Sequence, residues 1–526
     1  MTLSQTILKL RTEAKLSQEQ LADKLKVSRQ AIQKWEKETA EPELSNLVQL
    51  SKLFNITLDS LVFASDTRIV EEMPNERKIK PIIQKMHDWE VYSSQLRTEY
   101  KQSMEEGLDI EPYKELFDAV SKMPIGEEKE KIADVLFNIV LNAPMRKDYK
   151  YEEPSDIDGI RALRDKTIQP KKGSIPENFK DKVAGAWYGR IAGCLLGKPV
   201  EGIKTTDLIP LLKMSGNYPM HRYILTTDIT DEVKETVKWR FAGRCWADAV
   251  EAMPVDDDTN YTVLYQLLVD KYGRDFTPYD CSKMWVASQP KDAYCTAERV
   301  AFRNFINGYL PPESAVYKNP YREWIGAQIR GDYFGYINPG DAETAADMAW
   351  RDGCIAQVKN GIYGEMMVAA MLATAAVEKD IKKIILGGIS QIPKTSRLYE
   401  QIRSVIDSFD SGMSEKDFFD DLHKRYDERD GHDWCHTISN AEIVCACLLY
   451  GGGDYGRSVC MAVEQGFDTD CNGATVGSIL GMRGGMSAIS DEWTAPLHGK
   501  LCTSIFGVGV TEIDKLVEKT MTHLPQ

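Results

Sequence analysis

The chain of 526 residues has no cysteine before Cys194, and its 11 cysteines are spaced irregularly from there on. An odd, irregular set in a large chain is not the disulfide framework of a small secreted protein. No Cys-x-x-Cys pair occurs, since Cys445 and Cys447 are separated by a single residue. We therefore expect free, buried thiols and no zinc site.

Long hydrophobic runs are also absent. The longest apolar stretch, residues 366–377, is shorter than the ~20 residues that a helix needs to cross a bilayer. The first ten residues mix polar and apolar side chains, unlike a secretory signal. These features predict a cytoplasmic protein without membrane segments. The net charge of −15 argues against nucleic-acid binding by the whole chain, but not by one small domain.

Glycine is missing from residues 1–62 and scarce up to about residue 175, whereas the remainder is rich in Gly, Cys and Trp. Strand-like alternation of apolar and polar residues is rare throughout, which favours an all-α fold. Helical patterns cover residues 113–123 and 127–141, and a Gly- and Pro-containing stretch at 169–176 marks a boundary. We predict a domain at 1–65, a helical spacer or dimerisation segment at 66–175 and a large helical domain at 176–526.

The first domain has the pattern of a helix-turn-helix. Ser17 and Gln20 have the spacing of a capping box, and Ser28 is placed to cap a second helix over residues 29–37. Further apolar residues up to Leu61 fit a small five-helix domain. Residues 1–37 contain eight Lys or Arg against four Asp or Glu, so this part is locally basic. The pattern suits either a DNA-reading helix pair or a small bundle for protein contacts. The outward residues of the second helix are hydrogen-bond donors suited to phosphates and base edges: Arg29, Gln30, Gln33, Lys34 and Lys37.

The stretch from LSQEQLADKLKVSRQAIQKWEKE to LDSLV resembles the lambda-repressor/Cro-type (XRE) DNA-binding domain. The glycine often found in the turn of that family is Lys26 here. Such domains usually bind paired half-sites as dimers, so the resemblance implies duplex DNA as a partner and a homodimer. It places these residues at DNA-facing positions: Gln18, Ser28, Arg29, Gln30 and Gln33.

Two glycine ladders occur in the large domain, at residues 185–197 in GAWYGRIAGCLLG and at residues 473–485 in GATVGSILGMRGG. Each glycine inside a helix costs about 1 kcal/mol relative to alanine, so eight of them at a spacing of four need a reason. This spacing forms a stripe on one helix face, where the missing side chains let another helix approach. We therefore predict two tightly packed core helices.

Acidic residues stand at two expected helix starts, in PVDDDTNYT and GFDTDCNGA. A single Asp at a helix start needs no function, because it is a favoured cap. Three adjacent aspartates at 256–258 are either solvated on a loop or compensated by a cation, since buried like charges repel. If both helix starts are neighbours, their oxygens would select Mg²⁺, Mn²⁺ or Ca²⁺ over zinc.

The segments GAWYGRIAGCLLGKPVEG, DDDTNYTVL, INPGDAETAADMAWRDG, NGIYGEMMVAAMLATAA and GFDTDCNGATVGSILGM, in this order, resemble the ADP-ribosylglycohydrolase family over about residues 180–510. The resemblance implies an all-helical fold and two divalent ions, Mg²⁺ or Mn²⁺, below an ADP-ribose cleft. It implies these metal-ligand positions: Asp256, Asp257, Asp258, Asp468, Asp470 and Cys471.

This chain departs from the family pattern at several of those positions. Asp256 replaces a Thr, and Cys471 replaces another. Cys194 stands where the family often has Asp, and Gln357 where it often has His. Asp256 is therefore a direct ligand, a holder of water or a residue that points away.

The resemblance also implies roles in catalysis and substrate binding. Glu201 matches a glutamate beside the metals, and its alternative is a surface carboxylate after a proline turn. Glu201, Asp257 and Asp258 are the predicted catalytic residues. The candidates for substrate binding are Asn360, Gly361, Tyr363, Gly364 and His436, of which the first four suit a helix cap equally and His436 suits a structural role.

Two functions fit these features. One is a metal-dependent hydrolase that releases ADP-ribose from a modified protein, small molecule or nucleic acid. The other is a transcription regulator whose large domain senses an ADP-ribosyl or nucleotide ligand without turnover; Cys471 and Gln357 keep that alternative open.

Overall fold

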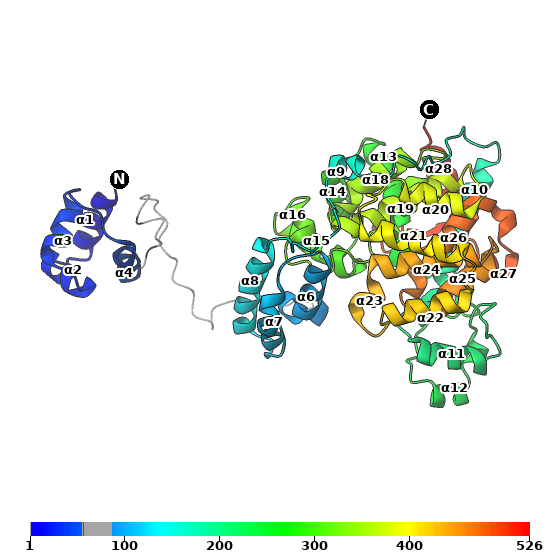
Figure 1. The fold of residues 1–526 in the computed structure, drawn as a ribbon, viewed down its shortest axis with the longest axis horizontal. Coiled ribbons are helices and arrows are strands. Elements are labelled where there is room, and N and C mark those ends of the chain that lie inside the picture. Colours follow the sequence, from blue (N-terminus) through cyan, green and yellow to red (C-terminus); the bar gives the residue numbers. More distant parts are fainter. Residues whose placement is uncertain (1, 55, 57–60, 62–86, 526) are drawn as a thin grey trace. The chain divides into compact units, whose positions relative to one another are not determined.

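The computed structural model of the protein describes residues 2–54, 56, 61 and 87–525. They belong to two compact units, residues 1–85 and residues 86–526, both built from helices (Figure 1). The strands in the described ranges are β1 (Lys500–Cys502) and β2 (Val510–Glu512), which pair antiparallel. The predicted all-α fold is confirmed.

Residues 1–85 begin with four helices around a small core. The caps predicted from sequence are present: the Ser17 side chain accepts a hydrogen bond from the Gln20 backbone, and the Ser28 side chain accepts one from Ala31. Lys26, in the turn, has the left-handed conformation at φ 53°. Leu21, Ile32 and other apolar side chains form the core. The fifth helix expected near Leu61 lies outside the described residues. The helices are α1 (Leu3–Glu13), α2 (Gln18–Leu25), α3 (Arg29–Glu36) and α4 (Leu44–Phe54).

The larger unit starts with a three-helix subassembly that has a core of its own, in which Leu96, Phe117 and Phe137 take part. The two helices expected over residues 113–123 and 127–141 appear here with slightly shifted ends. This subassembly contains the 3₁₀ turns η2 (Asp88–Glu90), η3 (Tyr92–Ser94) and η4 (Glu111–Tyr113), and the helices α6 (Leu96–Glu105), α7 (Lys114–Ser121) and α8 (Glu127–Asn142).

The remaining helices form one large bundle with a shared apolar core. No helix among the described residues is long and apolar enough to cross a membrane. Up to the middle of the bundle the helices are α9 (Ile157–Ala162), α10 (Phe179–Gly197), α11 (Thr205–Met214), α12 (Asp231–Thr236), α13 (Asp257–Tyr272), α14 (Pro278–Ser288), α15 (Thr296–Ile306), α16 (Glu313–Val316) and α17 (Asp332–Tyr336). After these come α18 (Ala342–Gly353), α19 (Lys359–Ala375), α20 (Ile381–Ile389), α21 (Arg397–Asp410), α22 (Glu415–Arg425), α23 (Gly431–Cys435), α24 (Thr437–Tyr450), α25 (Tyr455–Glu464), α26 (Thr469–Gly484), α27 (Asp491–Thr494) and α28 (Ile513–Met521).

The two glycine ladders face each other across α10 and α26. A Cβ atom added to Gly185 would lie 2.5 Å from the Gly481 carbonyl oxygen, and one added to Gly193 would lie closer still to Gly473. Gly189 meets Gly477 in the same way. The pairing runs in opposite directions along the two helices, which are therefore antiparallel. Backbone-to-backbone contact of this kind requires glycine, and it fixes the C-terminal end of α10 beside the start of α26.

Charged contacts attach the first part of the larger unit to the bundle. Arg322 pairs with Glu99 at 2.8 Å and with Glu106 at 2.5 Å, and Arg299 pairs with Glu90 at 2.7 Å. These carboxylates are buried, so each depends on its arginine for charge compensation. The segment around η2 and α6 is thereby held against α15 and against the segment that follows α16.

Candidate metal centre

The acidic motifs lie at the starts of α13 and α26. Asp256 caps α13 and accepts a hydrogen bond from the Asp258 backbone at 2.9 Å. Asp470 lies in the first turn of α26, two residues after the N-cap Asp468. Because the first backbone N–H groups of a helix are free, both helix starts favour carboxylates. Asp256, Asp258, Asp468 and Asp470 are all buried, which excludes a solvated loop.

A stripe of polar side chains on α10 faces these helix starts. Arg190, Cys194 and Lys198 follow one another at intervals of four residues and therefore share one helix face. The Lys198 ammonium contacts Asp256 Oδ2 at 2.6 Å. The Arg190 guanidinium lies 3.2 Å from Asp258 Oδ1 and 2.9 Å from Asp332 Oδ2. Two protein cations thus compensate part of the negative charge.

Ligand-type atoms gather in two groups that share Asp258. Cys194, Asp256 and Asp258 each offer one atom within 4.8 Å of the others, and Asp258, Asp470 and Cys471 do the same. The buried atoms Asp258 Oδ2 and Asp470 Oδ1 have no hydrogen-bond partner among the described residues. A buried carboxylate oxygen without a donor is costly, and a divalent cation would satisfy it. The residues present therefore fit a metal site.

Crowding of carboxylates shifts their proton affinities. Burial, followed by repulsion from Asp256, raises the pKa of Asp257 to about 7 and that of Asp470 to about 6. Repulsion from Asp470, followed by burial, raises the pKa of Glu201 well above its usual value. Burial also opposes ionisation of Asp256, but the Lys198 ammonium outweighs it and lowers the pKa of Asp256. Perturbed carboxyl groups in a cleft are typical of a functional site.

A cavity of about 340 Å³ opens onto this centre. Glu201, Asp257, Asp468, Asp470 and Cys471 line one part of it. Four aromatic side chains contribute to its other walls: Trp89, Tyr321, Trp324 and Trp434. The size is at the lower end of the range usual for small-molecule sites. Acids beside aromatic faces suit a ligand that carries hydroxyl groups and a flat ring.

The four candidates at the start of α19 lie in the core and are not among the residues that line this cavity. The Asn360 amide donates to Glu153 and to Glu323, both at 2.8 Å. The Tyr363 hydroxyl donates to the carbonyl of Pro154. Gly361 and Gly364 pack against neighbouring segments so closely that an added Cβ atom would clash.

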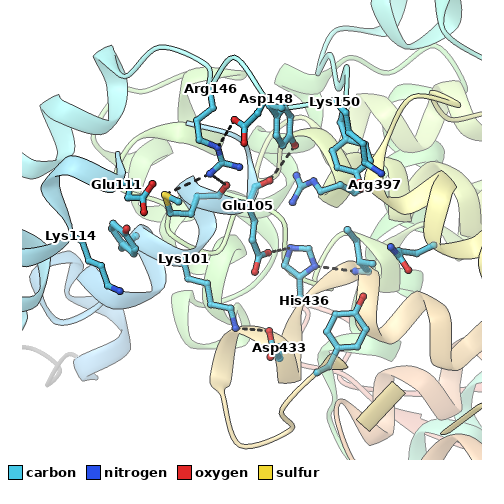
Figure 2. Close-up of a pocket in the computed structure, with 17 residues that line it drawn as sticks. Lys101, Glu105, Glu111, Lys114, Arg146, Asp148, Lys150, Arg397, Asp433 and His436 are labelled. Atoms are coloured by element: carbon cyan, nitrogen blue, oxygen red, sulfur yellow. Dashed lines mark hydrogen bonds and ion pairs between the residues drawn. The ribbon is translucent and has the colours of Figure 1, made fainter. Parts of the chain in front are cut away.

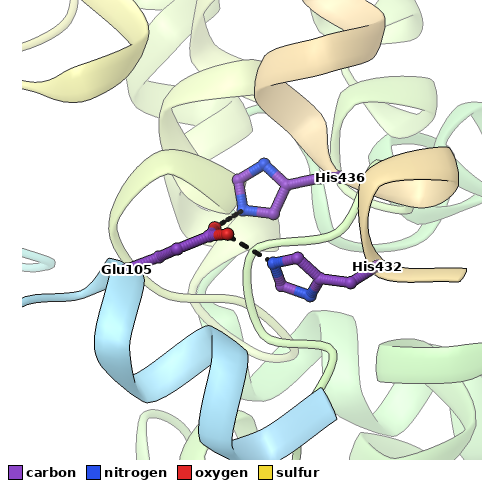
Figure 3. A group of neighbouring side chains, drawn as sticks. All are labelled: Glu105, His432 and His436. Carbon is purple, nitrogen blue, oxygen red and sulfur yellow. Dashed lines mark hydrogen bonds and ion pairs between the residues drawn. The ribbon is translucent and has the colours of Figure 1, made fainter. Parts of the chain in front are cut away.

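His436 belongs to a different group, with Glu105 and His432 (Figure 3). His432 Nε2 lies 3.0 Å and His436 Nε2 lies 3.8 Å from Glu105 Oε2. Trp324 Nε1 donates to His432 Nδ1, and the Ile438 backbone N–H donates to His436 Nδ1, both at 3.1 Å. Each ring therefore carries its proton on Nε2, where a metal would need a lone pair. We interpret the group as a contact that links α6 to the bundle through the hydrogen bond between His432 and Glu105.

The negative charge of the Glu105 carboxylate in this contact is strongly stabilised. Burial opposes ionisation of Glu105, but the hydrogen bond from His432 outweighs it and lowers the pKa of Glu105 to about 2. His436 and Glu105 also line a second cavity, of about 850 Å³, between α6 and the bundle (Figure 2). Its basic side chains are mostly engaged in ion pairs: Lys101 with Asp433, and Arg397 with Glu153 and Glu323.

Sequence reasoning missed several of these residues. Arg190 and Lys198 stand in the printed segment GRIAGCLLGK at the same spacing as the glycines, so their common face could have been predicted. Trp89, Trp324 and Gln95 gave no such signal, because they reach the cavity from segments far apart in the chain.

In the N-terminal unit, the DNA-facing candidates are on the surface. Ser28, Arg29, Gln30, Gln33 and Lys34 are exposed on or beside α3. Gln18 is partly covered, and its amide donates to Glu36 at 2.7 Å. Arg11 binds the same carboxylate, so Glu36 joins α1, α2 and α3.

Comparison with known proteins agrees with both assignments from sequence. A helix-turn-helix family model matches residues 7–61. The HTH-type transcriptional activator BcrR of Enterococcus faecalis is 38% identical over 82 residues, which are 16% of this chain and 40% of BcrR. The chain thus spans well under half of that relative.

Among solved structures, a chain of an ADP-ribosylglycohydrolase-related protein complex matches 66% of this chain and 98% of its own length. Its TM-score is 0.41 and its sequence identity 15%. A model of the ADP-ribosylglycohydrolase family matches residues 175–525, and the chain belongs to this family.

Proposed function

We propose that the protein hydrolyses the glycosidic bond of an ADP-ribosylated acceptor and releases ADP-ribose. The observation that carries this proposal is the pair of residue groups that share Asp258, with two buried carboxylate oxygens left without donors beside a cavity. Two divalent ions, Mg²⁺ or Mn²⁺, would be held by the acidic residues at both helix starts. The proposed ligands are Asp256, Asp257, Asp258, Asp468, Asp470 and Cys471.

The reaction replaces the acceptor at ribose C1″ with water through an oxocarbenium-like state. A divalent ion bound here would act as a Lewis acid and lower the pKa of a water molecule. Glu201 lines the cavity with a raised pKa, so it can hold a proton and donate it to the departing acceptor. Asp257, on the same wall, is placed to orient the attacking water. Asp258 connects α13 to α10 through its ion pair with Arg190.

A direct assay tests this function. The full chain is incubated with Mg²⁺ or Mn²⁺ and with ADP-ribosylated arginine, ADP-ribosylated serine, O-acetyl-ADP-ribose and ADP-ribosylated nucleic acid, and free ADP-ribose is measured. Release from at least one substrate, dependent on the divalent ion, is expected. No release from any of them would contradict the proposal.

The alternative is a ligand sensor without turnover. It is favoured by one observation: Lys198 already neutralises Asp256, so part of the acidic centre is compensated without a metal. In that case ADP-ribose would bind tightly, would not be released from any substrate, and would change the affinity of the protein for DNA.

We also propose that residues 1–65 bind duplex DNA, with α3 in the major groove and a homodimer on paired half-sites. The exposed donors Arg29, Gln30, Gln33 and Lys34 support this, together with Ser28 and Gln18. The division into a spacer or dimerisation segment at 66–175 and a catalytic domain at 176–526 stays a prediction, while residues 86–526 belong to one compact unit. The test is a mobility shift with genomic fragments: binding should weaken steeply with salt and should be lost in Arg29→Ala/Lys34→Ala but kept in Lys9→Ala. Salt-independent binding, or none, would contradict the assignment.

A further inference from the structure

The two residue groups around Asp258 differ in how many of their carboxylate oxygens already have a hydrogen-bond or ion-pair partner. In the group with Cys194, both Asp256 oxygens have partners: Lys198 contacts Oδ2, and the Asp258 backbone N–H donates to Oδ1. In the group with Cys471, Asp258 Oδ2 and Asp470 Oδ1 have no partner among the described residues. The unsatisfied atoms therefore gather on the side of Cys471.

The Cys471 thiol belongs to that second group by position as well. It lies in the first turn of α26, is 6% exposed and lines the cavity together with Asp470. Its ligand-type atom is within 4.8 Å of those of Asp258 and Asp470. In a tetrahedral site with bonds of about 2.3 Å to sulfur and about 2.1 Å to oxygen, the ligand atoms lie about 3.5 Å apart. Atoms that are now within 4.8 Å of one another would therefore have to move closer by at most about 1.4 Å.

Sulfur changes which ion such a group prefers. Mg²⁺ is bound almost entirely through oxygen and gives up its water reluctantly, whereas transition-metal ions such as Co²⁺ and Zn²⁺ bind thiolates well. We propose that the position formed by Asp258, Asp470 and Cys471 binds a sulfur-accepting transition-metal ion in preference to Mg²⁺. This departs from the Mg²⁺ or Mn²⁺ expected from sequence, and it concerns the same centre as the proposed function. Binding would displace the Cys471 proton to solvent and form the metal–sulfur bond.

Cys194 provides a matched comparison. It is also a buried thiol close to Asp258, but its neighbour Asp256 is already compensated by Lys198. Serine in place of either cysteine keeps a small polar side chain and removes the sulfur. Only the Cys471→Ser change should alter the choice of metal, since that group holds both unsatisfied oxygens, whereas the Cys194 group shares only the one on Asp258.

The experiment is a Co²⁺ titration of the metal-free full chain, followed by the near-ultraviolet absorption that arises when cobalt binds a thiolate. The absorption should appear with wild type and Cys194→Ser, and also with Cys295→Ser, which controls for the exposed thiol. It should be lost in Cys471→Ser, with Co²⁺ affinity reduced at least about tenfold, because even outer partners of a ligand are worth that much. Excess Mg²⁺ should not suppress it.

Three results would overturn the inference: cobalt binding without the absorption, absorption that persists in Cys471→Ser, or displacement of cobalt by an equal concentration of Mg²⁺. Thermal unfolding of each variant checks that it folds. The readout does not depend on turnover. Absorption without release of ADP-ribose from any substrate would support this inference and contradict the proposed hydrolase function. Release of ADP-ribose without the absorption would support the hydrolase function and contradict this inference.

Discussion

The guanidinium of Arg190 on α10 binds Asp258 on α13 twice, through its carboxylate at 3.2 Å and through its backbone carbonyl at 2.8 Å. Both side chains are fully buried, and the same guanidinium compensates Asp332. One cation therefore joins the glycine-lined helix to the acidic start of its neighbour.

Replacing Arg190 with Met should destabilise the protein strongly. Removing one partner leaves buried carboxylates without compensation, which typically costs about 3–5 kcal/mol. The control is Arg457→Met, which breaks an exposed ion pair with Glu415 and should change stability by less than about 1 kcal/mol. Chemical denaturation of both variants measures the difference, and equal effects would refute a structural role for the buried pair.

The contact between α10 and α26 should not tolerate a single added methyl group. In Gly193→Ala the new Cβ atom would meet the Gly473 carbonyl, and the helices must separate at a loss of about 1–3 kcal/mol. Gly431, at the start of α23, has no atom within 4 Å of an added Cβ and provides the control. Melting temperatures should fall for Gly193→Ala only; an unchanged value would show that the helices adjust freely.

Glu464 should make stability depend on pH. Burial raises its pKa to about 7, although a backbone hydrogen bond from Met220 opposes the shift. Its folded pKa therefore exceeds its unfolded one, so the folded state keeps a proton that the unfolded chain releases. That stability is lost as pH rises from about 4.5 through about 7.

Glu464→Gln fixes a neutral side chain and should gain stability relative to wild type as pH rises through this window. Glu177→Gln, at an exposed site, should show no such trend. Denaturation at several pH values measures both. A constant difference between Glu464→Gln and wild type would contradict the raised pKa.

Trp89 and Gln95 should contribute to ligand binding, although both lie outside the range matched by the family. Loss of one aromatic wall in Trp89→Ala should weaken ADP-ribose binding roughly threefold to tenfold, as aromatic contacts are worth about 0.5–1.5 kcal/mol. Calorimetry with ADP-ribose measures the effect, and Tyr113→Ala, at an exposed position of the same segment, should bind like wild type. Equal affinities of Trp89→Ala and wild type for ADP-ribose would show that this segment does not contribute to the binding site.

Local signals in the sequence predicted local structure well. Ser17 and Ser28 predict helix starts, because a capping side chain bonds to backbone groups only a few residues away. The spacing of the glycine ladders predicts close contact between two helices, because nothing else explains it. What could not be predicted depends on distant partners. Asn360 suits a cleft or a core, and its environment depends on Glu153 and Glu323, which come from other parts of the chain.

The central claim is that the acidic centre performs metal-dependent release of ADP-ribose. It is tested most directly by comparing wild type, Asp258→Ala and Asp470→Ala on one accepted substrate, each with the metal removed and then restored. The account predicts release by wild type only when the divalent ion is present, and no release by either variant under any condition. Unchanged turnover in both variants, or full activity of wild type without metal, would contradict it.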